Sequence, residues 1–218
     1  EKTVVLNFLK DIDNSPKENL QEVISNHTSD DFKMLCTHPF NELSGSSDIA
    51  NNLWAPIKDS FTPIQRRLDI FYAGINSLNE NNDVWISSMG HLMGVFNKEF
   101  FGLKPNYKSS LLRFAEFYKV KENKITEGAF FLDIFNFMQQ LGLSFIPQST
   151  GLICVTPGPM NHKGLKFELS DDKESLQTLN LIHRMRDRLV EGSKMKSFED
   201  ELLLDWKKDM IWWGPGGI

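Results

Sequence analysis

Four stretches in which apolar and polar residues alternate dominate the middle of the chain, and they constrain the fold more than any other feature. They are RRLDIFYAGIN at 66–76, VWISSMGHLMGVF at 84–96, LLRFAEFYKV at 111–120 and a run that begins after Lys124. A period of two is typical of half-buried strands. Polar turns separate the stretches, at 79–83 and at Lys121-Glu122-Asn123-Lys124. The pattern predicts a run of antiparallel strands.

Amphipathic helical segments precede these strands, at residues 3–12 and 15–24. Ser15, Pro16 and Glu18 predict a capping box with proline at the first helical position of the second segment. Residues 31–40 alternate like a strand, and a Gly/Ser turn then leads into a third helix that carries Trp54. Helices followed by a run of antiparallel strands are typical of the α+β class.

Two glycines, Gly90 and Gly94, lie inside the second alternating stretch. Glycine inside a strand usually marks a bulge, a bend or a close approach of backbone. We therefore expect N-terminal helices packed against a strongly curved antiparallel sheet, which gives a cone with a concave face suited to a small molecule.

Composition excludes several classes of function. The chain has 218 residues, 40% of them hydrophobic, and a formal charge of −5, which argues against a nucleic-acid or anionic-membrane partner. No apolar run approaches the roughly 20 residues of a membrane span. The two cysteines, Cys36 and Cys154, have no metal-ligand spacing and predict reduced thiols and a cytoplasmic location. No histidine or cysteine spacing indicates a metal, and no phosphate-binding loop indicates a nucleotide cofactor.

One acid, Asp133, ends the last alternating stretch after the charge-free run GAFFL. Burial among phenylalanines would raise the pKa of its carboxyl group and make it a proton donor and acceptor near neutral pH. Alternatively, Asp133 caps the short helical segment IFNFMQQLG that follows it. The residues alone leave both interpretations open.

Further candidates come from the alternation itself. Glu116 and Tyr118 share one face of their strand, and the sequence does not say whether that face lies inside. His91 lies on a strand near Trp85, either as a structural histidine or as a hydrogen-bonding partner or second acid/base group in a pocket. Together with Trp54, these residues are the predicted substrate-binding set.

Several blocks of this chain resemble those of SnoaL-like polyketide cyclases, in the nuclear-transport-factor-like (cystatin-like) superfamily. The resemblance lies in Lys124-Ile125-Thr126-Glu127, in Asp133 followed by Gln140-Leu141-Gly142, and in HPFNELSG, LWAPIKDSF and SMGHLMGVF. It covers residues 1–148, which we take as one cone domain.

The resemblance implies a cofactor-independent acid/base enzyme of the cyclase, isomerase or lyase type. Asp133 would be its catalytic acid/base, acting on an apolar, carbonyl-bearing small molecule. Family members commonly place tryptophan shortly before this aspartate, where this chain has Gly128-Ala129-Phe130. That departure leaves the substrate open. A non-catalytic module that binds a small molecule or dimerises is the alternative, because this fold serves many functions.

Residues 149–218 repeat the helix, helix, strand order with which the chain opens. Two helices are expected, at SLQTLNLIHRMRDRLVEG and SFEDELLLDW, before a strand and turn at KKDMIWWGPGGI. The last segment resembles the opening of the second domain in tandem SnoaL-like proteins. We expect an incomplete second copy whose exposed apolar side chains pack on the first domain or on another subunit, most simply in a homodimer.

Overall fold

The computed structural model describes residues 1–76, 82–143, 159, 161–191 and 197–207. It divides into two compact units, one from Glu1 to Phe167 and one that begins at Glu168. The expected strand and turn at 207–218, apart from Lys207, and most of the expected turn at 79–83 lie outside the described residues.

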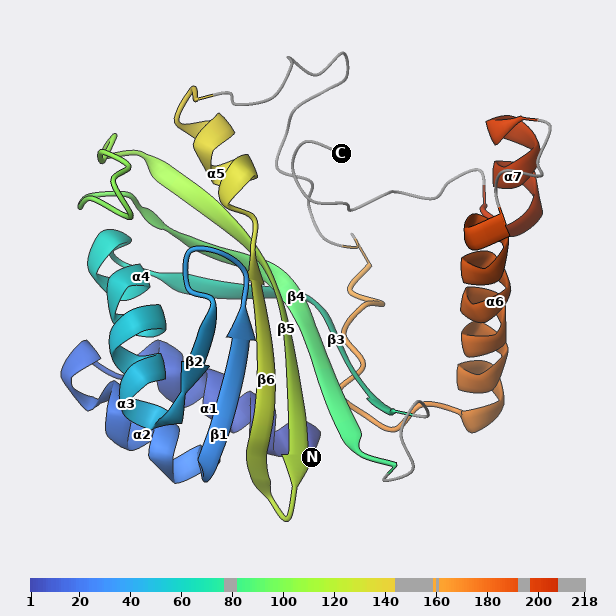
Figure 1. The fold of residues 1–218 in the computed structure, drawn as a ribbon, viewed down its shortest axis with the longest axis horizontal. Helices are drawn as coiled ribbons and strands as arrows, with labels where there is room; N and C mark the ends of the chain where they lie inside the picture. Colours follow the sequence, from blue (N-terminus) through green and yellow to red (C-terminus); the bar gives the residue numbers. More distant parts are fainter. Residues whose placement is uncertain (77–81, 144–158, 160, 192–196, 208–218) are drawn as a thin grey trace. The chain divides into compact units, whose positions relative to one another are not determined.

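The first unit begins with helices and continues with strands, as the sequence pattern predicted (Figure 1). Its helical elements are α1 (Lys2–Asn14), a 3-10 turn (Lys17–Asn19), α2 (Leu20–His27), α3 (Gly45–Ile49), a π-helical turn (Ala50–Trp54), α4 (Ala55–Ser60) and α5 (Ile134–Gln140). Its strands are β1 (Thr28–Cys36), β2 (Glu42–Ser44), β3 (Gln65–Ile75), β4 (Val84–Val95), β5 (Ser109–Lys121) and β6 (Lys124–Leu132).

The expected capping box before α2 is wrong. Ser15 is instead the residue that ends α1, where its N–H donates to the Asp11 carbonyl at 3.0 Å. The 3-10 turn at Lys17–Asn19 has no side-chain cap, and α2 starts after it. Pro16 precedes that turn in an extended conformation, so the chain bends there before the second helix begins.

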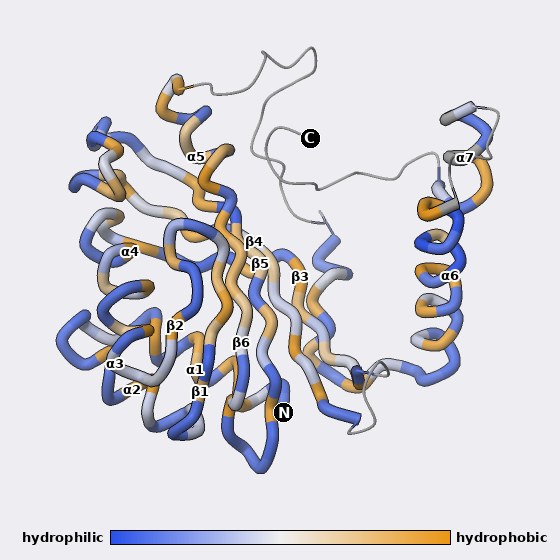
Figure 2. The backbone as a smooth tube through the Cα atoms, in the orientation of Figure 1, coloured by the Kyte–Doolittle hydropathy of each residue, from blue (hydrophilic) through white to orange (hydrophobic). Residues whose placement is uncertain are grey.

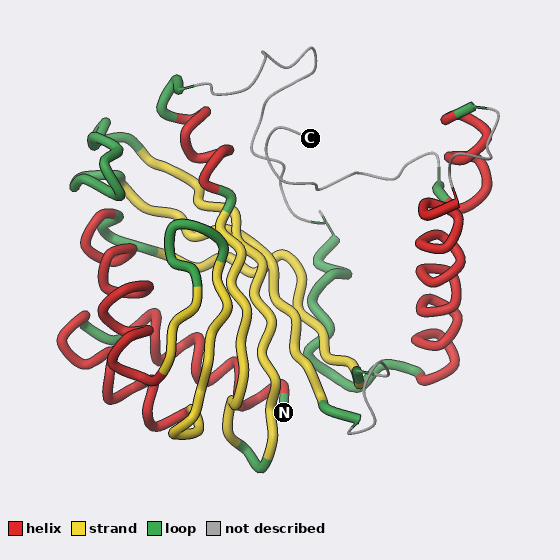
Figure 3. Tube along the Cα trace, viewed as in Figure 1, coloured by secondary structure: helices red, strands yellow, loops and turns green. Residues whose placement is uncertain are grey.

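The six strands form one sheet in the order β2-β1-β6-β5-β4-β3. Neighbours are antiparallel except β1 and β6, which run parallel, with Met34 opposite Gly128 and Cys36 opposite Phe130. The sheet is therefore mixed, which corrects the expectation of a purely antiparallel one. The α+β class with N-terminal helices against a curved sheet is confirmed, and Figure 3 shows the helices of residues 1–60 gathered on one side of the strands.

A bulge between β3 and β4 explains Gly90. The register shifts between Leu68 and Ile70 on β3, which leaves Asp69 unpaired in the ladder. A Cβ atom on Gly90 would lie 1.9 Å from the carbonyl oxygen of Arg67, so only glycine fits opposite the bulge. The expectation that a glycine inside this strand marks a bulge is confirmed. Bulges bend and twist a sheet locally, which supplies part of its curvature.

The core lies between the helices and the face of the sheet that they cover, called the inner face below. Along β5 every second side chain from Ser110 to Val120 is buried. Phenylalanines fill much of this layer, and Phe8, Phe32, Phe114, Phe130 and Phe137 are almost completely buried. Apolar stretches run along the central strands in Figure 2. The opposite, outer face of β5 carries partly exposed side chains.

The first unit extends past residue 148, where the sequence placed its end, because a later segment pairs with β3. The N–H of Phe71 donates to the Gly164 carbonyl at 2.8 Å, and the N–H of Lys166 donates to the Phe71 carbonyl at 2.7 Å. Phe167 packs on the Phe71 ring at 5.5 Å between centroids. The edge of β3 is covered over this stretch, which protects it from pairing with another chain.

The second unit contains α6 (Asp172–Glu191) and α7 (Phe198–Asp205), which match the two helices expected there. Arg184 and Arg188 on α6 hold Asp205 at the end of α7, at 2.9 and 2.7 Å. No helix in the described part of the chain is long and apolar enough to cross a bilayer.

Candidate functional site

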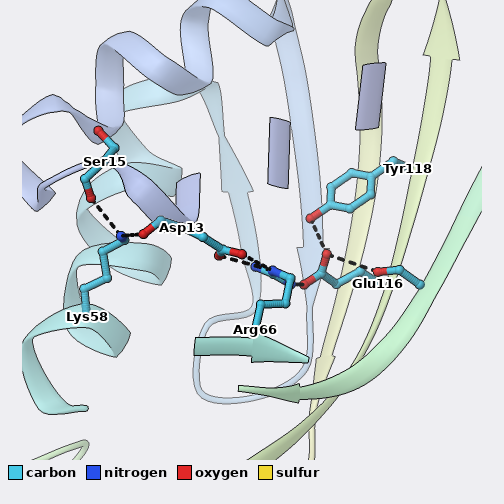
Figure 4. A network of polar contacts seen from close by, with 7 residues as sticks. Asp13, Ser15, Lys58, Arg66, Glu116 and Tyr118 are labelled. Atoms are coloured by element: carbon cyan, nitrogen blue, oxygen red, sulfur yellow. Dashed lines mark hydrogen bonds and ion pairs between the residues drawn. The ribbon is translucent and has the colours of Figure 1, made fainter. Parts of the chain in front are cut away.

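A buried polar network joins three elements on the inner face of the sheet (Figure 4). Arg66 from β3 lies between two acids, Asp13 at the end of α1 and Glu116 on β5. The Arg66 Nε atom is 3.0 Å from Asp13 Oδ2, and its Nη1 atom contacts Glu116 Oε1. Tyr118 donates its hydroxyl to Glu116 Oε2 at 2.9 Å. A single guanidinium thus bridges a carboxylate of the helical layer and one of the sheet.

Strand alternation explains how a glutamate comes to lie in this interior. Glu116 and Tyr118 occupy the β5 face that also carries Leu112 and Phe114, and both are 0% exposed. The guanidinium of Arg66 lies over two aromatic rings, 5.1 Å from the Trp54 centroid and 4.9 Å from that of Phe114. Stacking on rings stabilises a desolvated arginine. The predicted residues Trp54, Glu116 and Tyr118 therefore come together inside the cone.

Burial shifts the ionisation of this network. Loss of hydration raises the pKa of the Glu116 carboxyl group, and the nearby Arg66 guanidinium only partly opposes that shift. Burial also raises the pKa of the Tyr118 phenol well above its usual value, and the Glu116 carboxylate adds to the effect. Burial alone would lower the pKa of Arg66, but Glu116 and Asp13 raise it. Of the two acids that contact Arg66, Glu116 is fully buried, whereas the side chain of Asp13 is 29% exposed.

Two buried donors in the same place lack acceptors. Among the residues that the structure describes, neither Trp54 Nε1 nor Arg66 Nη2 has a hydrogen-bond partner. A buried N–H group without an acceptor is costly and rare. Since the Arg66 guanidinium lies over the Trp54 ring, both donors belong to one small region. An oxygen acceptor is the chemistry that they would satisfy.

The other predicted residues lie on the outer face. Asp133 is the N-cap of α5 and accepts from the Asn136 N–H at 2.9 Å. Its second carboxylate oxygen is 2.7 Å from Arg113 Nη2 on β5. Of the two interpretations of its side chain, the structure therefore shows helix capping. The sequence suggested that apolar side chains surround the Asp133 carboxylate, but the structure places it beside a cation. The start of α5 offers a backbone N–H group to one carboxylate oxygen, and the neighbouring strand supplies Arg113 to the other.

His91 and Trp85 also point to the outer face of β4. His91 Nδ1 is 3.0 Å from Asp69 Oδ2, on the bulge of β3, and burial lowers the pKa of this imidazole. His91 lies opposite Arg113, whereas Trp85 lies further along the strand, opposite Lys119. The sheet thus separates the predicted residues into an inner set and an outer set, and only the inner set forms a connected cluster with Glu116.

Sequence reasoning missed Asp13 and Arg66. The signal for Arg66 was present, because Arg66 and Arg67 are adjacent on a strand and must point to opposite faces. One of the two side chains must therefore lie on the same face of the strand as Leu68. Asp13 gave no comparable signal, since an acid at a helix end is usually solvated.

Elsewhere on this unit lies a polar groove of about 290 Å³, and most of the residues that line it carry hydroxyl groups. They are Ser25, Thr28, Ser29, Asp30, Ser44, Gly45, Ser46 and Ser47. None of them belongs to the predicted site residues. Within the described residues no group of three or more histidine, cysteine, aspartate or glutamate side chains is arranged to hold a metal ion.

Several solved structures are similar to this chain. IdmH from Streptomyces antibioticus, a candidate polyketide cyclase, is 12% identical, with 65% of this chain and 97% of that chain covered at a TM-score of 0.49. A candidate SnoaL-like polyketide cyclase from Jannaschia is 15% identical, with 63% and 90% covered at 0.47. An NTF2-like protein from Burkholderia thailandensis is 13% identical, with 65% and 96% covered at 0.46.

Their sequence identities of 15% or less and their TM-scores below 0.5 support no conclusion about the family, the substrate or the site residues of this chain. No family model and no curated protein matches the sequence. The site must therefore be judged by its own geometry.

Proposed function

We propose that this chain is a cofactor-independent acid/base enzyme of the cyclase, isomerase or lyase type, and that Glu116 is its acid/base group. The observation that carries the proposal is the fully buried Glu116 carboxyl, with its raised pKa, beside two donors that lack acceptors. A carboxyl group tuned toward neutral pH suits general acid/base catalysis. Glu116 was predicted from the sequence as a substrate-binding residue, and burial raises the pKa of its carboxyl group.

The proposed chemistry moves one proton. Ionised Glu116 would remove a proton from a carbon next to a carbonyl group, and the resulting acid would return it to the oxygen or carbon where charge had developed. Arg66 Nη2 and Trp54 Nε1 would donate to the carbonyl oxygen as that charge forms. The aromatic surroundings fit a mostly apolar body of the substrate. A ligand must open the packed core to reach this site, and Asp13 is the network member nearest to solvent.

A non-catalytic small-molecule-binding module remains the second candidate, and a separate observation favours it. Asp133 is the residue to which the family resemblance assigns the acid/base role, yet its carboxylate caps α5 and pairs with Arg113. An acid held in this way is occupied by structural bonds. The catalytic role of Asp133 and a cytoplasmic location stay predictions.

The test needs no known substrate, because proton removal next to a carbonyl exchanges hydrogen for deuterium. A panel of apolar ketones and keto esters is screened for binding, and each binder is incubated with the protein in D₂O and followed by NMR. We expect the wild-type protein to accelerate exchange and Glu116→Gln to lose that acceleration while still binding. Glu127→Gln is the matched control, because Glu127 is an exposed glutamate on β6.

The outcomes separate the candidates. Binding without exchange in the wild-type protein would support the non-catalytic module and sink the enzyme. If exchange survives in Glu116→Gln but is lost in Asp133→Asn, the acid/base role belongs to Asp133 as the family resemblance implies.

A further inference from the structure

Helix α6 exposes large apolar side chains to water along most of its length. Leu176 is 58% exposed and Val190 82%, and Leu179, Ile182 and Leu189 are also exposed. Figure 2 shows hydrophobic stretches recurring from turn to turn of this helix. A short helical hairpin with so much uncovered apolar surface gains little from its own packing.

Five of the exposed apolar residues lie on one face of the helix, whereas Leu181, which is 39% exposed, lies on the other. At about 100° per residue, Leu176, Leu179, Ile182, Leu189 and Val190 fall within one broad stripe, which we call the α6 stripe. The stripe also contains Asp172 near its start and Arg186 between its apolar residues. Arg184 and Arg188, which bind Asp205 of α7, lie on the other side. Helix α7 therefore leaves the stripe uncovered.

The two ends of α6 differ in net charge. Its start carries three acids, Asp171, Asp172 and Glu174, beside Lys173, whereas its end carries three arginines, Arg184, Arg186 and Arg188, beside Asp187 and Glu191. A parallel copy of the helix would bring like charges together, whereas an antiparallel copy brings each acidic start beside a basic end. Arg186 is available for such a pair, because it is 57% exposed and, within the part of the chain that the structure describes, its ion-pair partner is only its neighbour Asp187.

We propose that the α6 stripe binds the α6 stripe of a second copy of this chain in an antiparallel, twofold-symmetric pair. Placing the twofold axis at Leu179 sets the register. Leu176 then faces Ile182 of the second copy, and Asp172 faces Arg186 of the second copy. In this register Leu176 and Ile182 form the apolar pairs and Asp172 and Arg186 the ion pairs, whereas Leu189 and Val190 extend beyond the start of the second helix. This is the surface for the homodimer that the sequence led us to expect.

The first test compares two variants that add the same charge on opposite sides of α6. Leu179→Asp places a carboxylate on the proposed axis, whereas Gln177→Asp places one on the exposed far side of the helix. Sedimentation velocity of the full chain should show a dimer for the wild-type protein and for Gln177→Asp. Leu179→Asp should raise the dissociation constant roughly tenfold or more, the scale of a buried hot-spot residue. Circular dichroism checks that the helices remain.

A charge exchange tests the register itself. Asp172→Arg and Arg186→Asp should each weaken the dimer, and the two together should restore it, because the pair is then only reversed. A monomeric wild-type protein overturns the proposal. So does a dimer that tolerates Leu179→Asp, since another surface then forms it, and so does a double variant no tighter than the single ones.

Discussion

Arg66 is the single residue on which the inner network depends. It is the only cation in contact with Glu116 among the described residues, and its side chain is 3% exposed. Its neighbour Arg67 is 55% exposed and pairs with Asp69 on the outer face. Two arginines that are adjacent in sequence thus differ completely in environment, because the strand alternates.

Replacement of these arginines should therefore have unequal effects. Arg66→Met should lower the free energy of unfolding by about 3–5 kcal/mol, since it leaves a buried acid without its partner. Arg67→Met should cost at most about 1 kcal/mol, the range of an exposed ion pair. Urea titrations of both variants measure the two values. Equal small losses would mean that the Arg66 pair contributes no more than a surface contact.

At the residue scale the sequence predicted Trp54 as a pocket residue but left open whether Glu116 and Tyr118 point inward. Alternation states that Glu116 and Tyr118 share a face, but which face meets the helices depends on packing of elements far apart in the chain. Asp133 was harder still. Its run of apolar neighbours was visible, whereas Arg113 on the adjacent strand was not recognisable as its partner without the register of β5 and β6.

The β3–β4 pair shows how a backbone detail decides what a strand can tolerate. Gly90 lies where the bulge brings the Arg67 carbonyl against it, and Gly94 lies close to Phe61 and Pro63. Gly74, on β3, has nothing within 4 Å of the position that a Cβ atom would take. Glycines in one hairpin therefore differ in whether the surrounding structure has room for a side chain.

Alanine substitutions at Gly90 and Gly74 should differ in their effect on stability. Gly90→Ala should destabilise the first unit by about 1–3 kcal/mol or more, because the new methyl group forces the backbone of the bulge to move. Gly74→Ala should be neutral or stabilise by up to about 1 kcal/mol, as expected for glycine in an unstrained strand. Thermal unfolding gives the comparison. A harmless Gly90→Ala would mean that the bulge moves freely.

At the element scale, strands were predictable because their period of two is a local property. The turn between β5 and β6 was predictable for the same reason, and Glu122 and Asn123 have the positive φ angles, 51° and 61°, of a tight hairpin. The start of α2 was not, since Pro16 and the 3-10 turn shift it to Leu20. The parallel pairing of β1 with β6 was also invisible, because it joins segments that share no local pattern.

For the whole molecule, the buried Glu116 makes stability depend on pH. Its folded-state pKa lies above the ordinary value of 4.5, so the folded state holds its proton more tightly than the unfolded state. This contribution is fully present below pH 4.5 and is lost as pH rises through the folded pKa. His91 acts in the opposite sense, because its pKa is lowered and its contribution falls away as pH drops below 6.5.

Comparing the stability of the wild-type protein with that of Glu116→Gln isolates the contribution of Glu116. The stability of the wild-type protein minus that of Glu116→Gln should fall as pH rises from 4.5 toward neutrality, since glutamine has no proton to lose. Denaturant titrations across that range measure it, and His91 cancels in the subtraction. A difference that rises with pH over the same range would show that Arg66 keeps Glu116 ionised after all.

The parallel pair of β1 and β6 also determines when the first unit can be completed during synthesis. Thr28 pairs with Ile125 and Cys36 with Phe130, so β1 has only the short strand β2 as a partner until almost the whole unit has left the ribosome. Strands β3, β4 and β5 are neighbours in sequence and can join as hairpins before β6 is made. Until β6 arrives, Phe32 and Met34 lie on a two-stranded ribbon of β1 and β2 that is not joined to the rest of the sheet. The emerging chain should therefore be most prone to aggregation, and most dependent on chaperones, just before residue 124 appears.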